Sequence, residues 1–204
     1  MSAAFNRTKV TCFAYGQTGS GKTFTMMGEA ESPGLYLLAT HDIFKSIEQS
    51  FHGTTVHVSF YEIYCSKVLD LLNERAQCTM REDKNKRVNI VGLTESQVDN
   101  AGTLMELIEC GLEVRASGVT SANDDSSRSH AILTITLKNA GKGFGRISFI
   151  DLAGCERGSD TINNCKQTRI DGAEINKSLL ALKECIRAMD QDKAHLPFRG
   201  SKLT

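Results

Sequence analysis

The chain has 204 residues, of which 40% are hydrophobic, so it can form one domain with a packed core. Its 24 basic and 24 acidic side chains cancel, which argues against a globally basic protein, and we expect no nucleic-acid partner. The apolar runs are short and the N-terminus lacks a signal sequence, so we expect a soluble, intracellular protein with no membrane partner. The seven cysteines are scattered without Cys-x-x-Cys spacing, which favours reduced thiols over a disulfide framework or a zinc site.

Strand-like and helix-like segments alternate along the first half of the chain. An apolar run from Val10 to Tyr15 is typical of a buried parallel strand and leads directly into a glycine-rich loop. Helices are predicted over residues 22–27 and over 35 to about 49, where Leu38, Ile43 and Ile47 are among the apolar positions. Apolar and polar residues then alternate over 55–64, which predicts a strand.

The second half continues this alternation. Residues 79–91 contain a polar turn between strand-like flanks and predict a hairpin, and residues 101–116 predict a helix. Strands are predicted over 132–137 and over 146–151, the latter ending at Asp151. Apolar residues then recur at helical spacing from Ile175 to Met189, which predicts a long amphipathic helix. This order indicates an α/β fold with a central sheet flanked by helices.

The glycine-rich loop carries a phosphate-binding signature. Its spacing, Gly-x4-Gly-Lys-Thr, is the Walker A pattern of P-loop NTPases, in which glycines let backbone N–H groups face a phosphate. Its position between a predicted strand and a predicted helix makes a chance match improbable. We therefore predict that the loop binds a nucleoside triphosphate. The residues are Gly16, Gln17, Thr18, Gly19, Ser20, Gly21, Lys22 and Thr23.

Two further segments could sense the terminal phosphate. Asp151 ends an apolar strand and Gly154 follows three residues later, a pattern that fits either a magnesium-binding carboxylate with a phosphate-sensing amide or an ordinary strand-ending turn. Residues 123–130, Asn-Asp-Asp-Ser-Ser-Arg-Ser-His, are rich in hydroxyls. Composition alone favours a solvated loop there, and the alternative is a loop that coordinates Mg²⁺ and the attacking water.

Together these three segments resemble the P-loop, switch I and switch II of kinesin motor domains. The motifs Asn-x-x-Ser-Ser-Arg-Ser-His and Asp-Leu-Ala-Gly-x-Glu-Arg are both intact, and further kinesin-like segments occur at 61–64, 175–179 and 197–204. The resemblance covers the whole chain in the right order. It implies the P-loop NTPase fold of the kinesin motor core, with ATP and Mg²⁺ as ligands and tubulin in microtubules as the partner.

The resemblance also assigns roles to individual residues. It implies that Lys22 and Gly154 bind the phosphates, that Ser126 orients the attacking water, and that Arg128 pairs with Glu156. The metal shell is expected from Thr23, Ser127 and Asp151. The microtubule face is expected on the helix that carries Asn176 and on the stretch from His195 to Thr204, with Leu182 and Ile186 of the helix facing inward. Its contact residues are Asn176, Lys183, Glu184, Cys185, Arg187, Arg199 and Lys202.

The residues 182–188, Leu-Lys-Glu-Cys-Ile-Arg-Ala, are most similar to the internal-motor kinesins that depolymerise microtubule ends, the kinesin-thirteen subfamily. We therefore expect a Mg-dependent, microtubule-stimulated ATPase of the depolymerising type, located in the cytoplasm on the microtubule cytoskeleton, including the spindle. A plus-end-directed walking kinesin is the alternative. An unrelated P-loop GTPase is disfavoured because the chain has no Asn-Lys-x-Asp motif.

Relative to the family, residues 1–204 are expected to form an incomplete motor domain that lacks strands at both ends. An unpaired apolar strand edge promotes aggregation, and missing strands reduce the buried area. A second alternative is therefore an inactive fragment, or one that only binds a partner.

Overall fold

The structure is a computed structural model that describes residues 2–29, 31–117, 127–156 and 166–204, with only the backbone of 166–169 and 171. The helices are α1 (Ser2–Phe5), α2 (Lys22–Met27), α3 (Leu35–Ser50), α4 (Ala101–Ser117), α5 (Lys166–Asp190) and the 3₁₀ helix η3 (Phe198–Gly200). The strands are β1 (Lys9–Ala14), β2 (Gly28–Glu29), β3 (Ser32–Pro33), β4 (Thr54–Tyr64), β5 (Lys67–Asp70), β6 (Ala76–Glu82), β7 (Val88–Val91), β8 (Ser96–Val98), β9 (His130–Asn139) and β10 (Lys142–Asp151).

A mixed sheet forms the centre of the molecule. Its strand order in the described residues is β1-β10-β9-β4-β5-β6-β7, and β8 pairs with β4. β1 and β10 are parallel, whereas β10, β9 and β4 are antiparallel neighbours. The register of β1 and β10 places Ala14 beside Asp151. Because both strands run in the same direction, the loops that follow Ala14 and Asp151 leave the sheet at the same edge.

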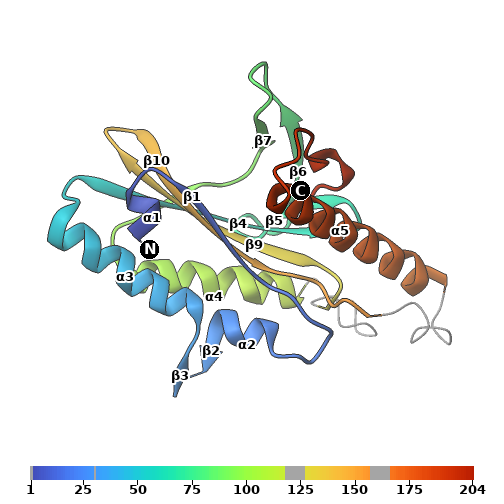
Figure 1. Cartoon of the computed structure of the whole chain (residues 1–204). Coiled ribbons are helices and arrows are strands. Elements are labelled where there is room, and N and C mark those ends of the chain that lie inside the picture. Colours follow the sequence, from blue (N-terminus) through green and yellow to red (C-terminus); the bar gives the residue numbers. More distant parts are fainter. Residues whose placement is uncertain (1, 30, 118–126, 157–165) are drawn as a thin grey trace.

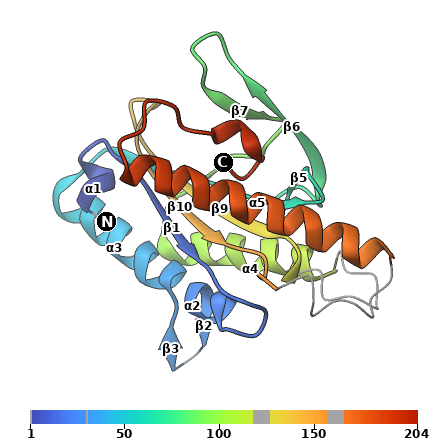
Figure 2. The same ribbon diagram turned by 45° about the vertical axis from the view of Figure 1, so that its right-hand side comes forward.

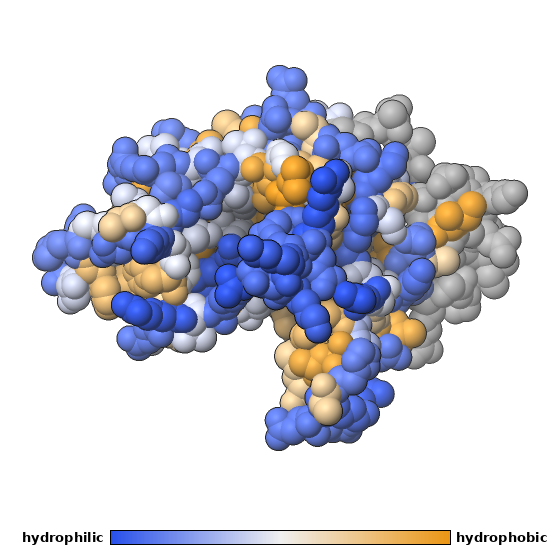
Figure 3. Space-filling view, turned by 90° about the horizontal axis from the view of Figure 1, so that it is seen from above, coloured by the Kyte–Doolittle hydropathy of each residue, from blue (hydrophilic) through white to orange (hydrophobic). Residues whose placement is uncertain are grey.

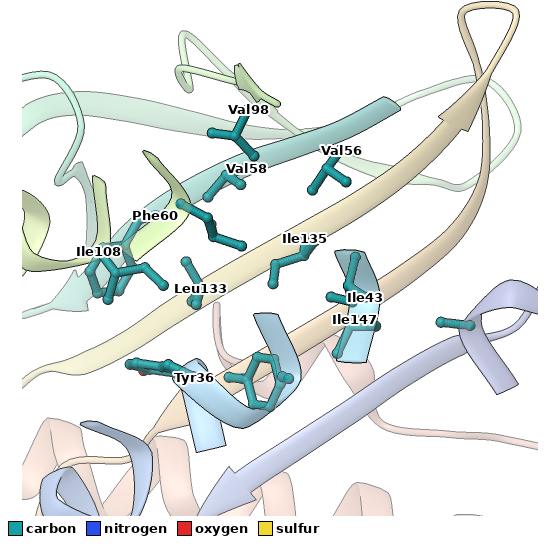
Figure 4. Close-up of a cluster of buried hydrophobic side chains, with 14 of the residues drawn as sticks. Tyr36, Ile43, Val56, Val58, Phe60, Val98, Ile108, Leu133, Ile135 and Ile147 are labelled. Carbon is teal, nitrogen blue, oxygen red and sulfur yellow. The ribbon is translucent and has the colours of Figure 1, made fainter. Parts of the chain in front are cut away.

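Helices cover both faces of the sheet (Figures 1 and 2). α3 and α4 pack on one face, where Tyr36, Ile43 and Ile108 meet the buried side chains of the strands (Figure 4). α5 crosses the opposite face, where Ile175 and Leu179 pack against a second apolar cluster that includes Leu152. The alternation of side chains in a strand supplies both clusters, since successive residues point to opposite faces.

The predicted P-loop NTPase fold class, with a central mixed sheet and flanking helices, is confirmed, and each predicted helix and strand is present. Two details were wrong. β1 is parallel but not buried, because it lies at the end of the strand order and Phe13 is 40% exposed. The long amphipathic helix, predicted from Ile175, begins earlier, since α5 starts at Lys166.

The β6–β7 hairpin projects from the body close to the C-terminal segment (Figure 1). An ion pair of 2.7 Å between Arg199 and Glu82 joins the two. Viewed from above, the molecule is mainly hydrophilic, with hydrophobic residues in separate patches (Figure 3). None of the helices in the described part of the chain has the length and apolar character that a membrane span requires.

Candidate functional site

The glycine loop connects β1 to α2 at the edge of the sheet. Gly19 and Gly21 have φ angles of 78° and 83°, in the left-handed region that glycine adopts without steric cost. Lys22 begins α2, and its Nζ donates a hydrogen bond of 2.9 Å back to the carbonyl of Gln17. The lysine ammonium is therefore held against the loop that is predicted to bind the phosphates.

Asp151 lies beside this loop because of the parallel pairing of β1 and β10. The hydroxyl of Thr23 donates to Asp151 Oδ2 at 2.8 Å. The other carboxylate oxygen, Oδ1, is buried and has no hydrogen-bond partner among the described residues. An unpaired buried carboxylate oxygen beside a hydroxyl suits a hard cation such as Mg²⁺. Among the described residues, no group of three or more His, Cys, Asp or Glu side chains is placed to hold a metal ion.

The segment after Asp151 lies against the glycine loop through several hydrogen bonds. The amide of Thr18 donates to Glu156 Oε1 at 2.6 Å, and the amide of Cys155 donates to the carbonyl of Gly16 at 3.3 Å. Partial burial by itself raises the pKa of Glu156, but hydrogen bonds from Thr18 and the charge of Lys22 outweigh it and hold the pKa below its usual range. Glu156 is therefore ionised at neutral pH.

Gly154 connects this segment to the end of the Ser/Arg-rich segment. Its amide donates to the carbonyl of Ser127 at 2.8 Å. A Cβ atom at Gly154 would lie 2.3 Å from Glu156 Oε1 and 2.5 Å from the hydroxyl of Thr18. A side chain at this position would therefore displace the Glu156 carboxylate and the Thr18 hydroxyl. The amide predicted to sense a terminal phosphate is thus already within the group of loops that would surround it.

A buried arginine on α4 forms an ion pair with Asp151. Arg115, on α4, is 5% exposed, and its Nη1 lies 3.1 Å from Asp151 Oδ2. Its guanidinium also donates to the carbonyl of Ser129 at 3.0 Å, and its Nε lies 3.9 Å from the buried carboxylate of Glu62. Arg115 therefore fixes Asp151 and the residue before β9 relative to each other.

His130 joins three segments. Its Nδ1 accepts a hydrogen bond of 3.0 Å from the amide of Ala153, and its Nε2 lies 2.7 Å from the hydroxyl of Ser178 on α5. Burial, reinforced by the charge of Arg115, lowers the pKa of His130 from 6.5 to about 4. The imidazole is therefore neutral at physiological pH.

These segments enclose a cavity of about 290 Å³. Its walls come from the glycine loop, from the start of α2, from Ser127 and from the segment that begins at Asp151. A cavity of this size is at the lower end of the range for small-molecule sites. The lining residues are Thr18, Gly19, Gly21, Lys22, Thr23, Phe24, Ser127, Asp151 and Leu152.

The sequence matches the family model of the kinesin motor domain over residues 1–204. The chain belongs to the kinesin family. Over 203 residues this kinesin is 56% identical to the human kinesin-like protein KIF24, covering 98% of the chain and 15% of that protein. Over 210 residues it is 54% identical to the kinesin-like protein KIN-13B of Arabidopsis thaliana, covering 98% of the chain and 30% of that protein. The expected likeness to the kinesin-thirteen subfamily is thereby confirmed.

A solved structure of a fast kinesin, described in connection with its ATPase mechanism and its interactions with microtubules, superposes with a TM-score of 0.84. It is 36% identical in sequence and matches 99% of the present chain and 60% of the other. This kinesin chain spans 15% of the length of the human relative and 30% of the length of the Arabidopsis relative. Membership of the family implies a nucleotide-binding site and a place among the proteins of the microtubule cytoskeleton.

The residues predicted for the microtubule face of this kinesin divide into two groups. The side chains of Lys183, Glu184 and Arg187 are exposed on α5, as are those of Asn176 and, near the C-terminus, Arg199 and Lys202. Cys185 is only 2% exposed, so its predicted role as a surface contact was wrong. The expectation that Ile186 faces inward was also wrong, because it is 38% exposed. Ile175 and Leu179 are buried as predicted, but from residue 181 onward the buried stripe lies one residue before the predicted one, at Ala181, Cys185 and Ala188.

Two of the exposed residues of α5 also have partners within the chain. The ammonium of Lys183 lies 4.9 Å from the centroid of the Tyr15 ring, immediately before the glycine loop. The side-chain amide of Asn176 donates to the carbonyl of Glu156 at 3.3 Å. The exposed side of α5 is therefore connected to the nucleotide loops.

Some predicted site residues stay predictions. Ser126 lies outside the described residues, and so do Asn123 and Arg157 of the two motifs. The ion pair between Arg128 and Glu156 also stays a prediction, since the hydrogen bonds of Glu156 described above involve Thr18.

Sequence reasoning missed Arg115, Glu62 and the role of His130. One signal was available for Glu62. It falls on the same face of β4 as Val56, Val58 and Phe60, so the alternation of the strand places its charge in the core. A buried charge requires a partner, although the sequence could not show that Arg75, 2.7 Å away, and Arg115, 3.9 Å away, provide it.

Proposed function

We propose that this chain is the ATP-hydrolysing core of a microtubule motor and that it works with Mg²⁺. The observation that supports this most is the meeting of Lys22, the Thr23–Asp151 pair and the Gly154 amide around one cavity. Phosphoryl transfer needs positioning and charge stabilisation more than it needs covalent chemistry from the protein. These groups are of the kind that supply both.

Each group has a defined task in this proposal. Lys22 exchanges the carbonyl of Gln17 for the β- and γ-phosphates of ATP. Thr23 and Asp151 hold Mg²⁺, which neutralises charge on the phosphates when bound. The Gly154 amide exchanges the carbonyl of Ser127 for a γ-phosphate oxygen, and Ser126 orients the attacking water. The water oxygen bonds to the γ-phosphorus as the bond to ADP breaks, which yields ADP, inorganic phosphate and a proton.

The test is ATP turnover of the intact protein with and without microtubules. We expect turnover that depends on Mg²⁺, rises at least about tenfold with microtubules, and is lost in Lys22→Ala. Lys45→Ala is the control, because Lys45 is exposed on α3 and does not line the cavity. Equal turnover in Lys22→Ala and in the unmodified protein would exclude the assignment of Lys22.

We further propose that the motor is of the type that depolymerises microtubule ends. The relatives that carry the KIN-13 name support this, and so does the exposure of Lys183 and Glu184 at the positions that resemble that subfamily. In this proposal the protein works in the cytoplasm on microtubules, including those of the spindle, and the exposed residues of α5 and of the C-terminal segment contact tubulin.

Stabilised microtubules should shorten from their ends when the intact protein and ATP are added. The variant Lys183→Ala/Glu184→Ala should shorten them several-fold more slowly, because charged pairs at an interface set association rates and register. Stepping of single molecules along microtubules of constant length would support the walking alternative instead. Absence of any nucleotide binding would support the inactive fragment.

A further inference from the structure

We propose that His130 is a positioning residue that couples the loop after Asp151 to helix α5 through Ser178. The inference deepens the proposed function, on which it rests, because it assigns the connection between the nucleotide site and the helix that carries the expected partner surface. It is built on three hydrogen bonds that run in sequence between segments distant in the chain.

The first hydrogen bond fixes the tautomer of the imidazole. The amide of Ala153 can only donate, so His130 Nδ1, 3.0 Å away, must be the unprotonated acceptor. In the neutral imidazole the proton then resides on Nε2. His130 is 3% exposed, so water does not compete for these positions.

The second and third hydrogen bonds follow from this assignment. Nε2–H donates to the hydroxyl of Ser178 at 2.7 Å, which leaves the hydroxyl proton free to donate to the carbonyl of Ile175, also at 2.7 Å. Each donor in this series thereby has an acceptor, and all three hydrogen bonds are donated in the same direction, from Ala153 through His130 and Ser178 to Ile175. Ser178 is buried as well, at 9% exposure.

The position of Ala153 gives this chain of hydrogen bonds its significance. The adjacent residue, Gly154, donates its amide to Ser127 beside the cavity. Ala153 and Gly154 are consecutive, so a shift of the backbone that brings the Gly154 amide to a ligand also shifts Ala153, whose own N–H lies in the preceding peptide unit. Because the Ala153 amide holds His130, and His130 holds Ser178, the movement reaches α5 through directed hydrogen bonds and not only through apolar contact.

The coupling is tested with variants that cut the link at different atoms. Ser178→Ala removes the hydroxyl that receives Nε2–H. His130→Asn retains an acceptor for the Ala153 amide but is too short to reach Ser178. Ser178→Thr retains a hydroxyl that can bond within the helix. Ser148→Ala is the matched control, since it also removes a partly buried hydroxyl with a hydroxyl partner at 3.3 Å, but in β10.

Hydrogen exchange of α5 is measured in the intact protein with and without Mg²⁺ and a non-hydrolysable ATP analogue. We expect the analogue to change protection of residues 175–190 in the unmodified protein, in Ser178→Thr and in Ser148→Ala. In Ser178→Ala the change should shrink roughly fivefold, the effect of one ordinary hydrogen bond on an equilibrium. Affinity for the analogue should stay within about twofold, because Ser178 does not line the cavity.

A double variant separates coupling from general destabilisation. Ser178→Ala and His130→Asn cut the same hydrogen bond, so their combination should reduce the response of α5 no further than the larger single effect. Effects that add, or an unchanged response of α5 in Ser178→Ala, would overturn the proposal. Loss of the response in Ser148→Ala would overturn it as well.

The proposed function can fail without the coupling proposal failing. If the unmodified protein binds the analogue but microtubules do not stimulate turnover, the motor assignment fails while the exchange experiment still tests the coupling. If the unmodified protein binds no nucleotide, the tautomer of His130 becomes the test of the coupling proposal. Nitrogen chemical shifts of His130 in the ligand-free protein should show a protonated Nε2 and a bare Nδ1. A proton on Nδ1 would overturn the proposal.

Discussion

Replacing Arg115 by methionine tests how strongly the buried charges behind the site stabilise the fold. Methionine has nearly the helix propensity of arginine, so α4 itself should be little affected. The replacement removes the ion pair with Asp151 at 3.1 Å and the hydrogen bond to the carbonyl of Ser129. Both charged side chains of the pair are only 4% exposed, so the carboxylate of Asp151 loses its buried counter-charge without gaining water.

Breaking a buried ion pair by removing one partner costs about 3–5 kcal/mol. We expect Arg115→Met to lose this amount of unfolding free energy, measured by urea denaturation followed by circular dichroism. Arg199→Met is the control. It removes an ion pair with Glu82 at 2.7 Å in which the arginine is 85% exposed, so its loss should not exceed about 1 kcal/mol.

A double-mutant cycle with Asp151→Asn identifies the partner. If Arg115 and Asp151 stabilise each other, the double variant should be more stable than the sum of the single effects predicts, by about 1–3 kcal/mol. Equal losses in Arg115→Met and Arg199→Met would refute the reasoning from burial. Strict additivity in the cycle would refute the assignment of Asp151 as the partner.

Three further predictions concern single residues. Gly154→Ala should weaken binding of a fluorescent ATP analogue at least about tenfold, because the added Cβ displaces the Glu156 carboxylate 2.3 Å away; binding within twofold of normal would contradict this. Gly111→Ala should destabilise the fold by about 1–3 kcal/mol in urea, because its Cβ would lie 2.4 Å from the buried Phe60 ring. Gly172→Ala, with open space around the Cβ in α5, should instead be neutral or stabilising by up to about 1 kcal/mol, and equal effects at both glycines would be inconsistent with this packing. The pKa of His130 falls from 6.5 to about 4 on folding, so between these pH values only the unfolded state gains a proton. The free energy of unfolding should therefore be full above pH 6.5 and fall by about 3 kcal/mol toward pH 4. His130→Gln should remove this pH dependence in urea titrations at several pH values, and an unchanged pH dependence would exclude His130 as its source.

Local pattern in the sequence determined the elements and the nucleotide loop. The alternation over β4 and the helical spacing over α3 and α4 depend on neighbours a few residues apart, so they were predictable without tertiary information. The Walker A spacing is similarly local. The exposed stripe of α5 was only partly predictable, because one residue of rotation decides whether Cys185 or Ile186 is buried.

Tertiary structure alone decided which distant groups meet. The register of β1 on β10 places Ala14 beside Asp151, and with it the glycine loop beside the carboxylate. Arg115 reaches Asp151 from a helix 36 residues earlier in the chain, and His130 reaches Ser178 across 48 residues. No periodicity encodes such pairs, since they depend on how the strands are ordered and which face each helix covers. The sequence determined that a phosphate loop exists, and the packing of the sheet decided which groups surround it.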